Sequence, residues 1–326
     1  MNNDVKESIV ASRDIPQLEV DKSLFSKRSL VFAAIASLTY LLLSVILIGF
    51  KTDQLVLIAL FNVMYFSSHV TRKFITGFSI FIVFWIIFDY MKAFPNYKYN
   101  TVHIESLYNA EKTLFGIHLN GILVTPNEYW LSNHKPFLDV ITGFAYLCWV
   151  PVPLIFAGIL FFRNRKHFFY FSLTFLLVNI IGFIGYYIYP AAPPWYVQLR
   201  GFEFIASTPG NTAGLARFDS FFHVSIFHGL YSKSSNVFAA MPSLHSAYPV
   251  IVLYYGLKYK AGYWNIFFAL LTATIWFSAV YNSHHYVLDI IMGVICAIAG
   301  IFLFRFLADK TAIGRKWMKR LVEVTT

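Results

Sequence analysis

The sequence predicts an all-α, polytopic membrane protein with about eight transmembrane helices. Of the 326 residues, 58% are hydrophobic and only 13% are charged, and the mean hydropathy is +0.59. This composition is too apolar for an ordinary soluble domain. Apolar stretches of about 20 residues, the length needed to cross the hydrocarbon core of a bilayer, recur along the chain. Aromatic residues make up 19% of the chain and supply anchors for the membrane interface.

Eight apolar stretches are assigned as spans, of which the second and the sixth are short. They lie at residues 30–50, 54–70, 74–91, 137–161, 167–189, 243–257, 264–281 and 286–306. The chain is predicted to form one membrane domain between polar ends. Its expected parts are a cytoplasmic N-terminal tail (1–28), two N-terminal transmembrane helices (29–72), a six-helix membrane core (73–308) and a basic cytoplasmic tail (309–326).

The first 28 residues mix basic and acidic side chains and lack the apolar run of a signal peptide, so a retained polar tail is expected. With this tail in the cytoplasm, Lys and Arg residues near the span ends gather on the same side, at 72–73, 163–166, 258–260 and 310–320. An even number of spans places both termini there. The net charge of +10 reflects this bias and an attraction to anionic lipid, and it does not indicate nucleic-acid binding.

Two long non-cytoplasmic loops are expected, at residues 92–136 and 190–242. In the first, apolar residues recur at helical spacing and predict an amphipathic helix at the membrane interface. This stripe consists of Ile104, Leu107, Tyr108, Leu114, Phe115 and His118. The two cysteines, Cys148 and Cys296, lie within predicted spans and are interpreted as core residues, so no disulfide is expected.

Two short stretches place ionisable residues at the starts of spans. "PSLHS" brings His245 to the start of the sixth span, and "HHYVLD" brings His285 and Asp289 to the start of the eighth. Residues four apart share one face of a helix, so the carboxylate of Asp289 can hold one nitrogen of the His285 ring and leave the other basic. Because two spans separate the histidines, both lie on the same side of the membrane.

This arrangement suits phosphate chemistry. Helix N-termini favour anions, one imidazole can act as a nucleophile oriented by the carboxylate, and the other can protonate the leaving oxygen. The residue types also allow a metal site, because zinc binds histidine and carboxylate side chains. Its ligands would be His245, His284, His285 and Asp289. The chain has no HExxH motif to support a membrane metalloprotease, and we expect neither a metal nor another cofactor.

"PSLHS" and "SxxxxxHHYxxD" (278–289) together resemble the second and third motifs of the type 2 phosphatidic acid phosphatase superfamily. The leucine between Ser243 and His245 and the doubled histidine resemble its inositol phosphorylceramide synthase branch, as does "GYYIYPAAPPWYV" (185–197) for the first motif. The resemblance covers roughly residues 75–306. It implies that His285 is the nucleophile and forms a phosphohistidine, that Asp289 orients it, and that His245 is the acid on the leaving group.

The departures from the superfamily pattern are informative. Its phosphatases carry a Lys and an Arg in the first motif and an Arg in the third, all of which bind phosphate, whereas the matching positions here are Gly182, Tyr189 and Ala279. A phosphodiester carries one negative charge and a phosphomonoester nearly two, so a diester needs fewer cations. We therefore expect transfer of a phospho-head group in place of its hydrolysis. Inositol phosphate is expected to pass from a phospholipid to a lipid alcohol, expected to be ceramide, with release of diacylglycerol.

Further polar residues are candidates for contacts with the phosphate or head group, and each is equally compatible with an ordinary loop residue. They are Arg217 and Lys135 for positive charge, Asp139, Asp219 and His134 for hydrogen bonds to a polyol, and Ser243 and Tyr189 within the motifs. The prolines in "YPAAPPW" are expected to shape the backbone above the site, because they end a helix and restrict the chain.

Two alternatives stay open. A lipid phosphate phosphatase of the same superfamily would use the same three residues with water as the acceptor. A transporter is the non-enzyme alternative, but transporters gather polar groups near the bilayer midplane, whereas here they gather at one face. The expected partners are a phospholipid donor and a sphingolipid acceptor, with no nucleic acid. The site is expected on the non-cytoplasmic leaflet, which is the periplasmic side of the inner membrane in a bacterium or the Golgi lumen in a eukaryote.

Overall fold

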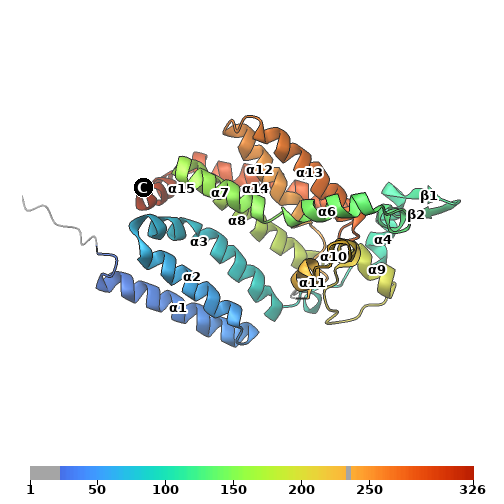
Figure 1. The fold of residues 1–326 in the computed structure, drawn as a ribbon, viewed down its shortest axis with the longest axis horizontal. Helices are drawn as coiled ribbons and strands as arrows, with labels where there is room; N and C mark the ends of the chain where they lie inside the picture. The colour runs from blue at the N-terminus through green and yellow to red at the C-terminus, as the bar shows by residue number, and fades with distance from the viewer. Residues whose placement is uncertain (1–22, 233–235) are drawn as a thin grey trace, which may run out of the picture.

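The computed structural model describes residues 23–232 and 236–326, and within these ranges the chain is almost entirely helical (Figure 1). The predicted all-α membrane fold is confirmed. The described residues contain fifteen α-helices, three short 3₁₀ helices and one two-stranded antiparallel hairpin. Residues 1–22 of the predicted N-terminal tail lie outside the described residues.

Each predicted span corresponds to a helix or, for the fourth span, to a pair of helices. These helices are α1 (Lys27–Ile48), α2 (Thr52–Ser67), α3 (His69–Tyr90), α6 (Pro136–Leu147) with α7 (Pro151–Arg163), α8 (Arg165–Ile188), α12 (Leu244–Lys258), α13 (Trp264–Tyr281) and α14 (Val287–Lys310). The other elements are η1 (Met91–Ala93), η2 (Asn96–Lys98), α4 (Glu105–Phe115), β1 (Ile117–Leu119), β2 (Ile122–Val124), α5 (Pro126–Ser132), α9 (Pro194–Arg200), η3 (Ala213–Leu215), α10 (Ala216–Phe222), α11 (Ile226–Tyr231) and α15 (Ala312–Thr325).

Among the described residues, five helices are long and apolar enough to cross a membrane: α1, α3 extended through η1, α8, α13 and α14. The pair α6 and α7 adds a sixth if the two are taken as one bent span. Helix α2 is apolar but has 16 residues, and α12 has 15. The count of eight spans therefore stays a prediction.

The fourth predicted span, residues 137–161, consists of two helices with a bend between them. Helix α6 ends at Leu147, α7 begins at Pro151, and the two are bent by 40°. Pro151 and Pro153 have no backbone N–H to continue the hydrogen-bond ladder of α6, but they fit the first turn of α7, where N–H groups have no intrahelical partner. The break places the Trp149 ring 4.3 Å from that of His245, centroid to centroid.

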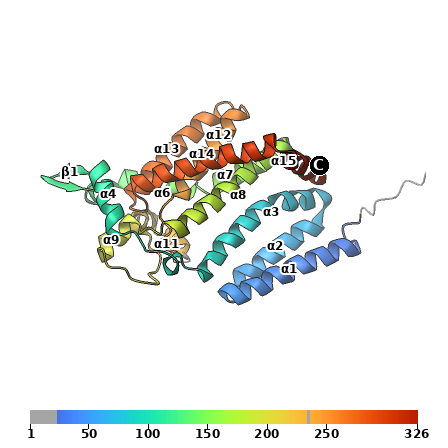
Figure 2. The same cartoon turned by 180° about the vertical axis from the view of Figure 1, so that it is seen from behind.

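Helix α8 runs through the centre of the bundle, between α3, α7, α12 and α14 (Figures 1 and 2). Two glycines permit its close packing. A Cβ on Gly182 would lie 2.6 Å from Cδ2 of Leu244 at the start of α12, and a Cβ on Gly300 of α14 would lie 2.4 Å from Cγ2 of Val178. These close approaches bring the start of α12 and the middle of α14 against α8.

Helices α1 and α2 form a hairpin that packs on α3 at the edge of the bundle (Figure 2). Large apolar side chains of α1, such as Ile46, are exposed along most of the helix, which suits contact with lipid. Two hydrogen bonds fasten the hairpin. Ser44 Oγ lies 2.9 Å from the Tyr90 hydroxyl of α3, and the Asn62 amide of α2 donates to Ser37 Oγ of α1 at 2.9 Å.

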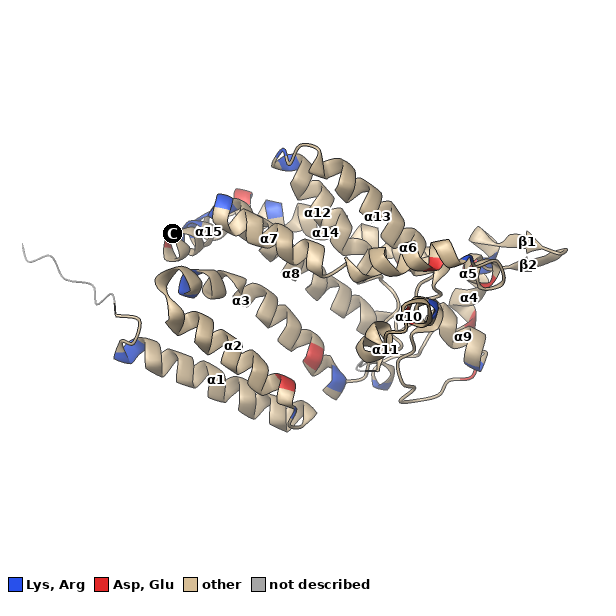
Figure 3. Ribbon diagram, in the orientation of Figure 1, with Lys and Arg blue, Asp and Glu red and all other residues tan. Residues whose placement is uncertain are grey.

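The basic C-terminal segment, predicted as a tail, forms helix α15. Met318 is buried, and Nε of Arg165 donates to the carbonyl of Thr325 at 3.1 Å, which fastens α15 to the start of α8. Lys and Arg residues gather at this end of the molecule, where α1 begins and the chain ends (Figure 3). The opposite end is covered by α4, α5, the β1–β2 hairpin and α9 to α11 (Figure 1).

The predicted amphipathic helix is present as α4. Leu107 is buried as expected, but Leu114 is 64% exposed, and His118 lies in β1 beyond the helix. The polar residue Glu111 takes a buried place on the inner face instead. The stripe therefore predicted the helix but only part of its packed face.

Candidate active site

The helices that carry the two histidine motifs start in direct backbone contact. Ser243 caps α12 by accepting a hydrogen bond from the Ser246 N–H, as N-cap serines do. The N–H of Ser243 donates to the carbonyl of Asp289 at 2.9 Å. A Cβ on Gly293 of α14 would lie 2.1 Å from the Ser243 carbonyl oxygen, so a glycine is required there. The starts of α12 and α14 are thereby locked together.

His245, His285 and Asp289 lie together at this junction. Nδ1 of His245 is 3.0 Å from Nε2 of His285, and Nδ1 of His285 is 3.4 Å from Oδ2 of Asp289. Which ring nitrogen carries the proton in the histidine pair depends on the tautomer. The relay therefore runs from the carboxylate through the His285 ring to the His245 ring.

The spacing of His285 and Asp289 predicted that both lie on one helix, but only Asp289 does. Helix α14 begins at Val287, two residues after His285. Asp289 accepts a hydrogen bond from the Tyr286 N–H at 2.9 Å through Oδ2, which caps the helix and points the carboxylate back toward His285. The turn before it is closed by the N–H groups of His284 and His285, which both donate to the Ala279 carbonyl at 3.0 Å. Asp289 lies in the first turn of α14 and caps it, and this capping brings its carboxylate next to the His285 ring.

Two buried atoms of this relay have no hydrogen-bond partner among the described residues: Nδ1 of His285 and Oδ1 of Asp289. The His285 residue is 5% exposed and Asp289 is 0% exposed. At 3.4 Å, their contact is longer than a formed hydrogen bond. Buried polar groups without partners are costly, and catalytic hydrogen bonds are often long until substrate binds.

Burial lowers the pKa of His285 to about 4, and the nearby backbone of Ala240 only partly offsets this effect. Desolvation disfavours the charged imidazolium and acts in this direction for any buried histidine. The His285 ring is therefore neutral near pH 7. A neutral ring has a lone pair available for attack on phosphorus.

His284 faces away from this relay. Its Nε2–H donates to the Thr212 carbonyl at 3.0 Å, and its ring stacks on Tyr231 with centroids 4.5 Å apart. It therefore joins the catalytic turn to the loop that precedes η3. Within residues 23–232 and 236–326, no group of three or more His, Cys, Asp or Glu side chains is placed to hold a metal ion.

The proline-rich stretch contacts the turn that carries His285. Pro193 and Pro194 begin α9, whose Trp195 N–H donates to the Ser283 carbonyl at 3.0 Å. Gln198 of the same helix donates through Nε2 to Ser283 Oγ at 3.1 Å. Ser283 has a positive φ of 58°, a conformation that non-glycine residues rarely adopt without support. The α9 contacts hold this residue in place.

The three positions at which superfamily phosphatases carry cations are all filled by packing. Gly182 abuts Leu244, so a longer side chain would displace the start of α12. Ala279 is fully buried, and the Tyr189 ring stacks on His103 at a centroid distance of 3.8 Å and an interplanar angle of 4°. None of the three side chains can supply a cation, and at Gly182 a longer side chain would not fit.

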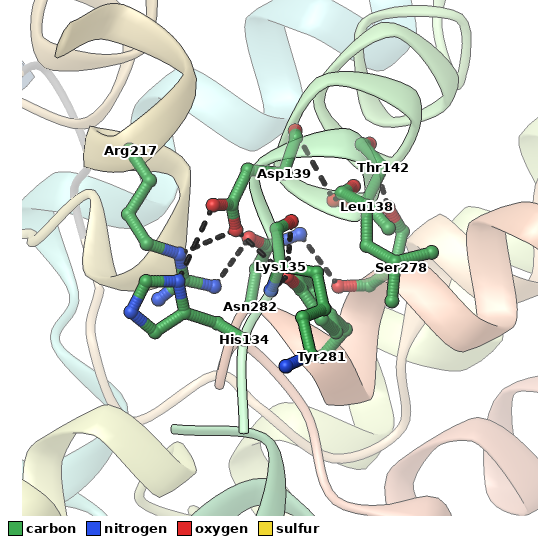
Figure 4. A network of polar contacts seen from close by, with 9 residues as sticks. All are labelled: His134, Lys135, Leu138, Asp139, Thr142, Arg217, Ser278, Tyr281 and Asn282. Carbon is green, nitrogen blue, oxygen red and sulfur yellow. Dashed lines mark hydrogen bonds and ion pairs between the residues drawn. The ribbon is translucent and has the colours of Figure 1, made fainter. Parts of the chain in front are cut away.

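A second polar cluster, which we call the Asp139 network, brings four of the substrate-binding candidates together (Figure 4). Oδ1 of Asp139 accepts from Nε of Arg217 at 2.6 Å and from the Tyr281 hydroxyl at 2.8 Å. His134 Nδ1 lies 3.4 Å from Oδ2 of Asp139, and the backbone N–H of Lys135 donates to the Tyr281 hydroxyl at 2.9 Å. Because Tyr281 ends α13, the network borders the turn that leads to His285.

The other three candidates lie outside this network. Asp219 accepts hydrogen bonds from the N–H groups of Phe227 and His228 at 3.2 and 2.9 Å, so its carboxylate holds the start of α11. Ser243 is the buried N-cap of α12, and Tyr189 is stacked as described above. All three have structural contacts in this arrangement.

Two residues that the sequence analysis did not single out contact the catalytic turn directly. Glu111 of α4 accepts hydrogen bonds from the N–H groups of Val287 and Leu288, and Asn127 of α5 donates to two carbonyls, one of them that of His285. A signal for Glu111 was present, since it follows Leu107 by four residues and so places a carboxylate on the apolar face of α4. Nothing comparable distinguishes Asn127.

Comparison with known proteins agrees with this geometry. The family model of the PAP2 superfamily matches residues 115–303. A phosphoinositol dihydroceramide synthase of Bacteroides thetaiotaomicron is 45% identical over 283 residues, which cover 86% of this chain and 93% of the relative. No solved structure gives a significant match.

More distant relatives come from fungi. The catalytic subunit of the inositol phosphorylceramide synthase of Saccharomyces cerevisiae is 28% identical over 65% of this chain and 52% of its own length. The inositol phosphorylceramide synthase of Candida albicans is 28% identical over 63% of this chain and 42% of its own length. The histidine motifs, the all-helical membrane fold and these matches together show that the chain belongs to the PAP2 superfamily.

Proposed function

We propose that this protein is an inositolphosphotransferase that moves phosphoinositol from phosphatidylinositol to a ceramide-type lipid alcohol and releases diacylglycerol. The observation that carries the proposal is the His245–His285–Asp289 relay, with 3.0 Å between the two histidine rings. The substrate class is inferred from the relative that is 45% identical to this chain and is named a phosphoinositol dihydroceramide synthase.

In the first half-reaction, the lone pair on Nε2 of His285 attacks the phosphorus of the donor lipid. A P–N bond forms and the bond from phosphorus to the diacylglycerol oxygen breaks, while protonated His245 gives its proton to that oxygen. Asp289 stabilises the positive charge that develops on the His285 ring. The two facing ring nitrogens are 3.0 Å apart, so the rings must turn away from one another for the phosphate to enter between them.

In the second half-reaction, the hydroxyl of the ceramide-type lipid attacks the phosphorus of the phosphohistidine. His245, now neutral, takes the hydroxyl proton, an O–P bond forms and the P–N bond breaks. This returns His285 to its neutral state and His245 to its protonated state, so the cycle closes without a cofactor. One residue serves as acid and then as base, as microscopic reversibility requires.

A diester donor is supported by the charges near the site. The three cation positions of superfamily phosphatases are filled by packing, and Arg217 is paired with Asp139 at 2.6 Å. Arg217 donates to Asp139 through Nε and to Asn282 Oδ1 through Nη2 at 3.5 Å. A guanidinium has five N–H donors, so others remain for a singly charged phosphate or for inositol hydroxyls. Asp139, His134 and Lys135 border the same region and are proposed to contact the head group.

The reaction is proposed to occur on the non-cytoplasmic leaflet. Basic residues gather at the end of the bundle opposite the site, which supports a cytoplasmic position for that end (Figure 3). Two such residues, Arg72 and Lys73, lie in the first turn of α3. Accessibility of a single cysteine introduced at Glu105, on the site side, to a membrane-impermeant thiol reagent in intact cells tests this orientation.

The function is tested with purified protein in detergent and head-group-labelled phosphatidylinositol, with and without ceramide or dihydroceramide. We expect a labelled sphingolipid only when the acceptor is present, with an equal amount of diacylglycerol. Quenching without an acceptor should trap acid-labile label on the wild-type protein and none on His285→Ala. Absence of a labelled sphingolipid from every sample would contradict the transferase proposal.

The lipid phosphate phosphatase alternative predicts a different product. If water is the acceptor, free inositol phosphate should appear at equal rates in both samples, and phosphatidic acid should be dephosphorylated. We expect little of either, because the missing cations weaken the hold on a doubly charged phosphomonoester.

A further inference from the structure

The first two N–H groups of α14 are capped by a side chain from a distant part of the chain. Oε1 of Glu111 accepts from the Val287 N–H at 2.9 Å, and Oε2 accepts from the Leu288 N–H at 3.1 Å. N–H groups in the first turn of any helix have no intrahelical partner, and a buried helix start must find partners elsewhere. Glu111 is fully buried, so its carboxylate has no alternative role as a solvated surface charge.

Asn127 holds the other side of the same turn. Its Nδ2 donates to the carbonyls of Val280 and His285, at 2.8 and 2.9 Å. Asn127 is also fully buried. One amide therefore bridges the end of α13 to the residue that carries the reactive ring, and it fixes the length of the turn between them.

The two residues belong to one packed unit outside the helical bundle. The Tyr108 hydroxyl of α4 donates to Oε1 of Glu128 at 2.9 Å, and Oε2 of Glu128 accepts from the Thr125 N–H at 2.7 Å, which caps α5. Helices α4 and α5 are thus joined to one another and both contact the turn. We call Glu111 and Asn127 the α4–α5 clamp.

We propose that Glu111 and Asn127 are positioning residues that hold the 280–288 turn so that Nε2 of His285 faces the phosphorus of the donor lipid. This inference rests on the proposed function. Glu111 supports the turn where α14 starts, and Asn127 supports the backbone of His285 itself. Effective attack needs near-contact geometry, and a misplacement of about 1 Å can cost about 100-fold in rate.

The charge state of Glu111 offers a readout that a merely structural residue would lack. Burial raises the pKa of Glu111 to about 7, partly offset by the N–H groups of Val287 and Leu288, and the Asp289 carboxylate raises it further. The other titratable groups around the clamp are Tyr286 before α14, Glu128 on α5 and Tyr108 on α4 itself. Above pH 7 both oxygens accept hydrogen bonds, whereas below it a proton occupies one oxygen and weakens the cap.

The test measures kcat and KM of the wild type, Glu111→Gln, Glu111→Asp and Asn127→Ser between pH 6 and 8, with Glu105→Gln as the matched control. Glu105 lies on the same helix, but its side chain is exposed. For Glu111→Gln we expect kcat to fall about 10- to 100-fold with KM changed less than about 3-fold. The wild-type kcat should fall as the pH drops from 8 to 6, and that of Glu111→Gln should be nearly independent of pH.

Glu111→Asp keeps the charge and should recover part of the lost rate together with the pH dependence. Asn127→Ser should lower kcat with little change in the pH profile. A folded Glu111→Gln with wild-type kcat and a wild-type profile would overturn the inference, as would an equal loss in Glu105→Gln. If Glu111→Gln does not fold, a wild-type kcat that is constant from pH 6 to 8 would overturn it. Failure of the proposed function itself is distinct, since the wild type would then form no labelled sphingolipid at any pH.

Discussion

Helices α1 and α8 look alike as sequences but have opposite surroundings in the molecule. Their most apolar 18-residue stretches have mean hydropathies of 2.5 and 2.0, yet 11% of the stretch in α1 is buried and 67% of that in α8. A helix that is apolar on all sides can be surrounded by either lipid or protein. Hydropathy therefore identifies the membrane-spanning helices without showing which of them build the active site.

The difference between the two helices lies in their buried polar groups. In α8, Asn179 accepts a hydrogen bond from the Tyr248 hydroxyl of α12, and Thr174 Oγ1 lies 2.6 Å from the Tyr255 hydroxyl of the same helix. In α1, the corresponding contacts, of Ser37 with Asn62 and of Ser44 with Tyr90, are only partly buried. Helices α8 and α12 are joined by buried polar pairs, whereas the polar contacts of the N-terminal hairpin are partly exposed.

The largest contrast is expected between histidines in the two regions. His285→Ala should reduce transfer by about 1,000-fold or more, because the nucleophile is lost, while His69→Ala at the exposed start of α3 should leave it unchanged. Initial rates with labelled phosphatidylinositol and ceramide measure both. A His285→Ala protein with substantial activity would refute the phosphohistidine mechanism.

Two ion pairs give the next contrast. Asp139→Asn breaks the Arg217 pair, whose carboxylate is buried, and should destabilise the protein by about 1.5–3 kcal/mol. Asp89→Asn breaks the partly exposed pair with Lys92 and should cost about 0–1 kcal/mol. Thermal unfolding in detergent measures the two shifts. Equal shifts would mean that the Asp139 network contributes no more to stability than a surface pair.

The pKa of His285 predicts how stability depends on pH. An unfolded histidine takes up its proton near pH 6.5, and the buried ring does so only near pH 4. Between these values the unfolded state binds more protons, so stability is lost as the pH falls from about 6.5 toward about 4, by at most about 1.4 kcal/mol per pH unit. Unfolding scans of the wild type and His285→Ala across this range should show a shallower loss in the variant. Parallel curves would indicate that the ring protonates normally in the folded state.

The smallest contrast compares two interhelical asparagines. Asn179→Ala leaves the Tyr248 hydroxyl buried without its partner and should cost about 1–3 kcal/mol. Asn62→Ala in the N-terminal hairpin should cost about 0.6 kcal/mol, the usual size of a hydrogen bond between membrane helices. Unfolding midpoints in the same detergent measure the difference. A larger cost for Asn62→Ala would reverse the distinction between core and edge.

The sequence carried enough information to find every apolar helix and to bring His245, His285 and Asp289 to one place. Local rules explain this success, since span lengths and motif positions are local properties of the chain. The last helix starts where it was predicted, but His285 lies before it, because the i, i+4 rule was applied where a capping rule holds. Asp289 lies three residues after Tyr286 and accepts its N–H, the usual arrangement at a helix start.

The polar contacts around the site could not be predicted from sequence spacing, because they join residues far apart in the chain. Asp139 meets Arg217 and Tyr281 across 78 and 142 residues of sequence, so no spacing pattern relates them. The same holds for Glu111, which meets Val287 across 176 residues. Sequence analysis placed Asp139 and Arg217 among the candidates by residue type, but their mutual pairing depends on how the loops fold over the bundle.

The contact between Gly293 and Ser243 bears on which step limits the rate of turnover. Because the backbones at the two helix starts touch, the backbones of His245 and His285 should stay together as one rigid unit, within which only the two rings turn to admit a phosphate. One lipid must diffuse away from this unit and another must arrive while its backbone geometry stays the same. We therefore expect lateral exchange of lipids to limit turnover, so that the enzyme runs faster in a fluid bilayer than in an ordered one.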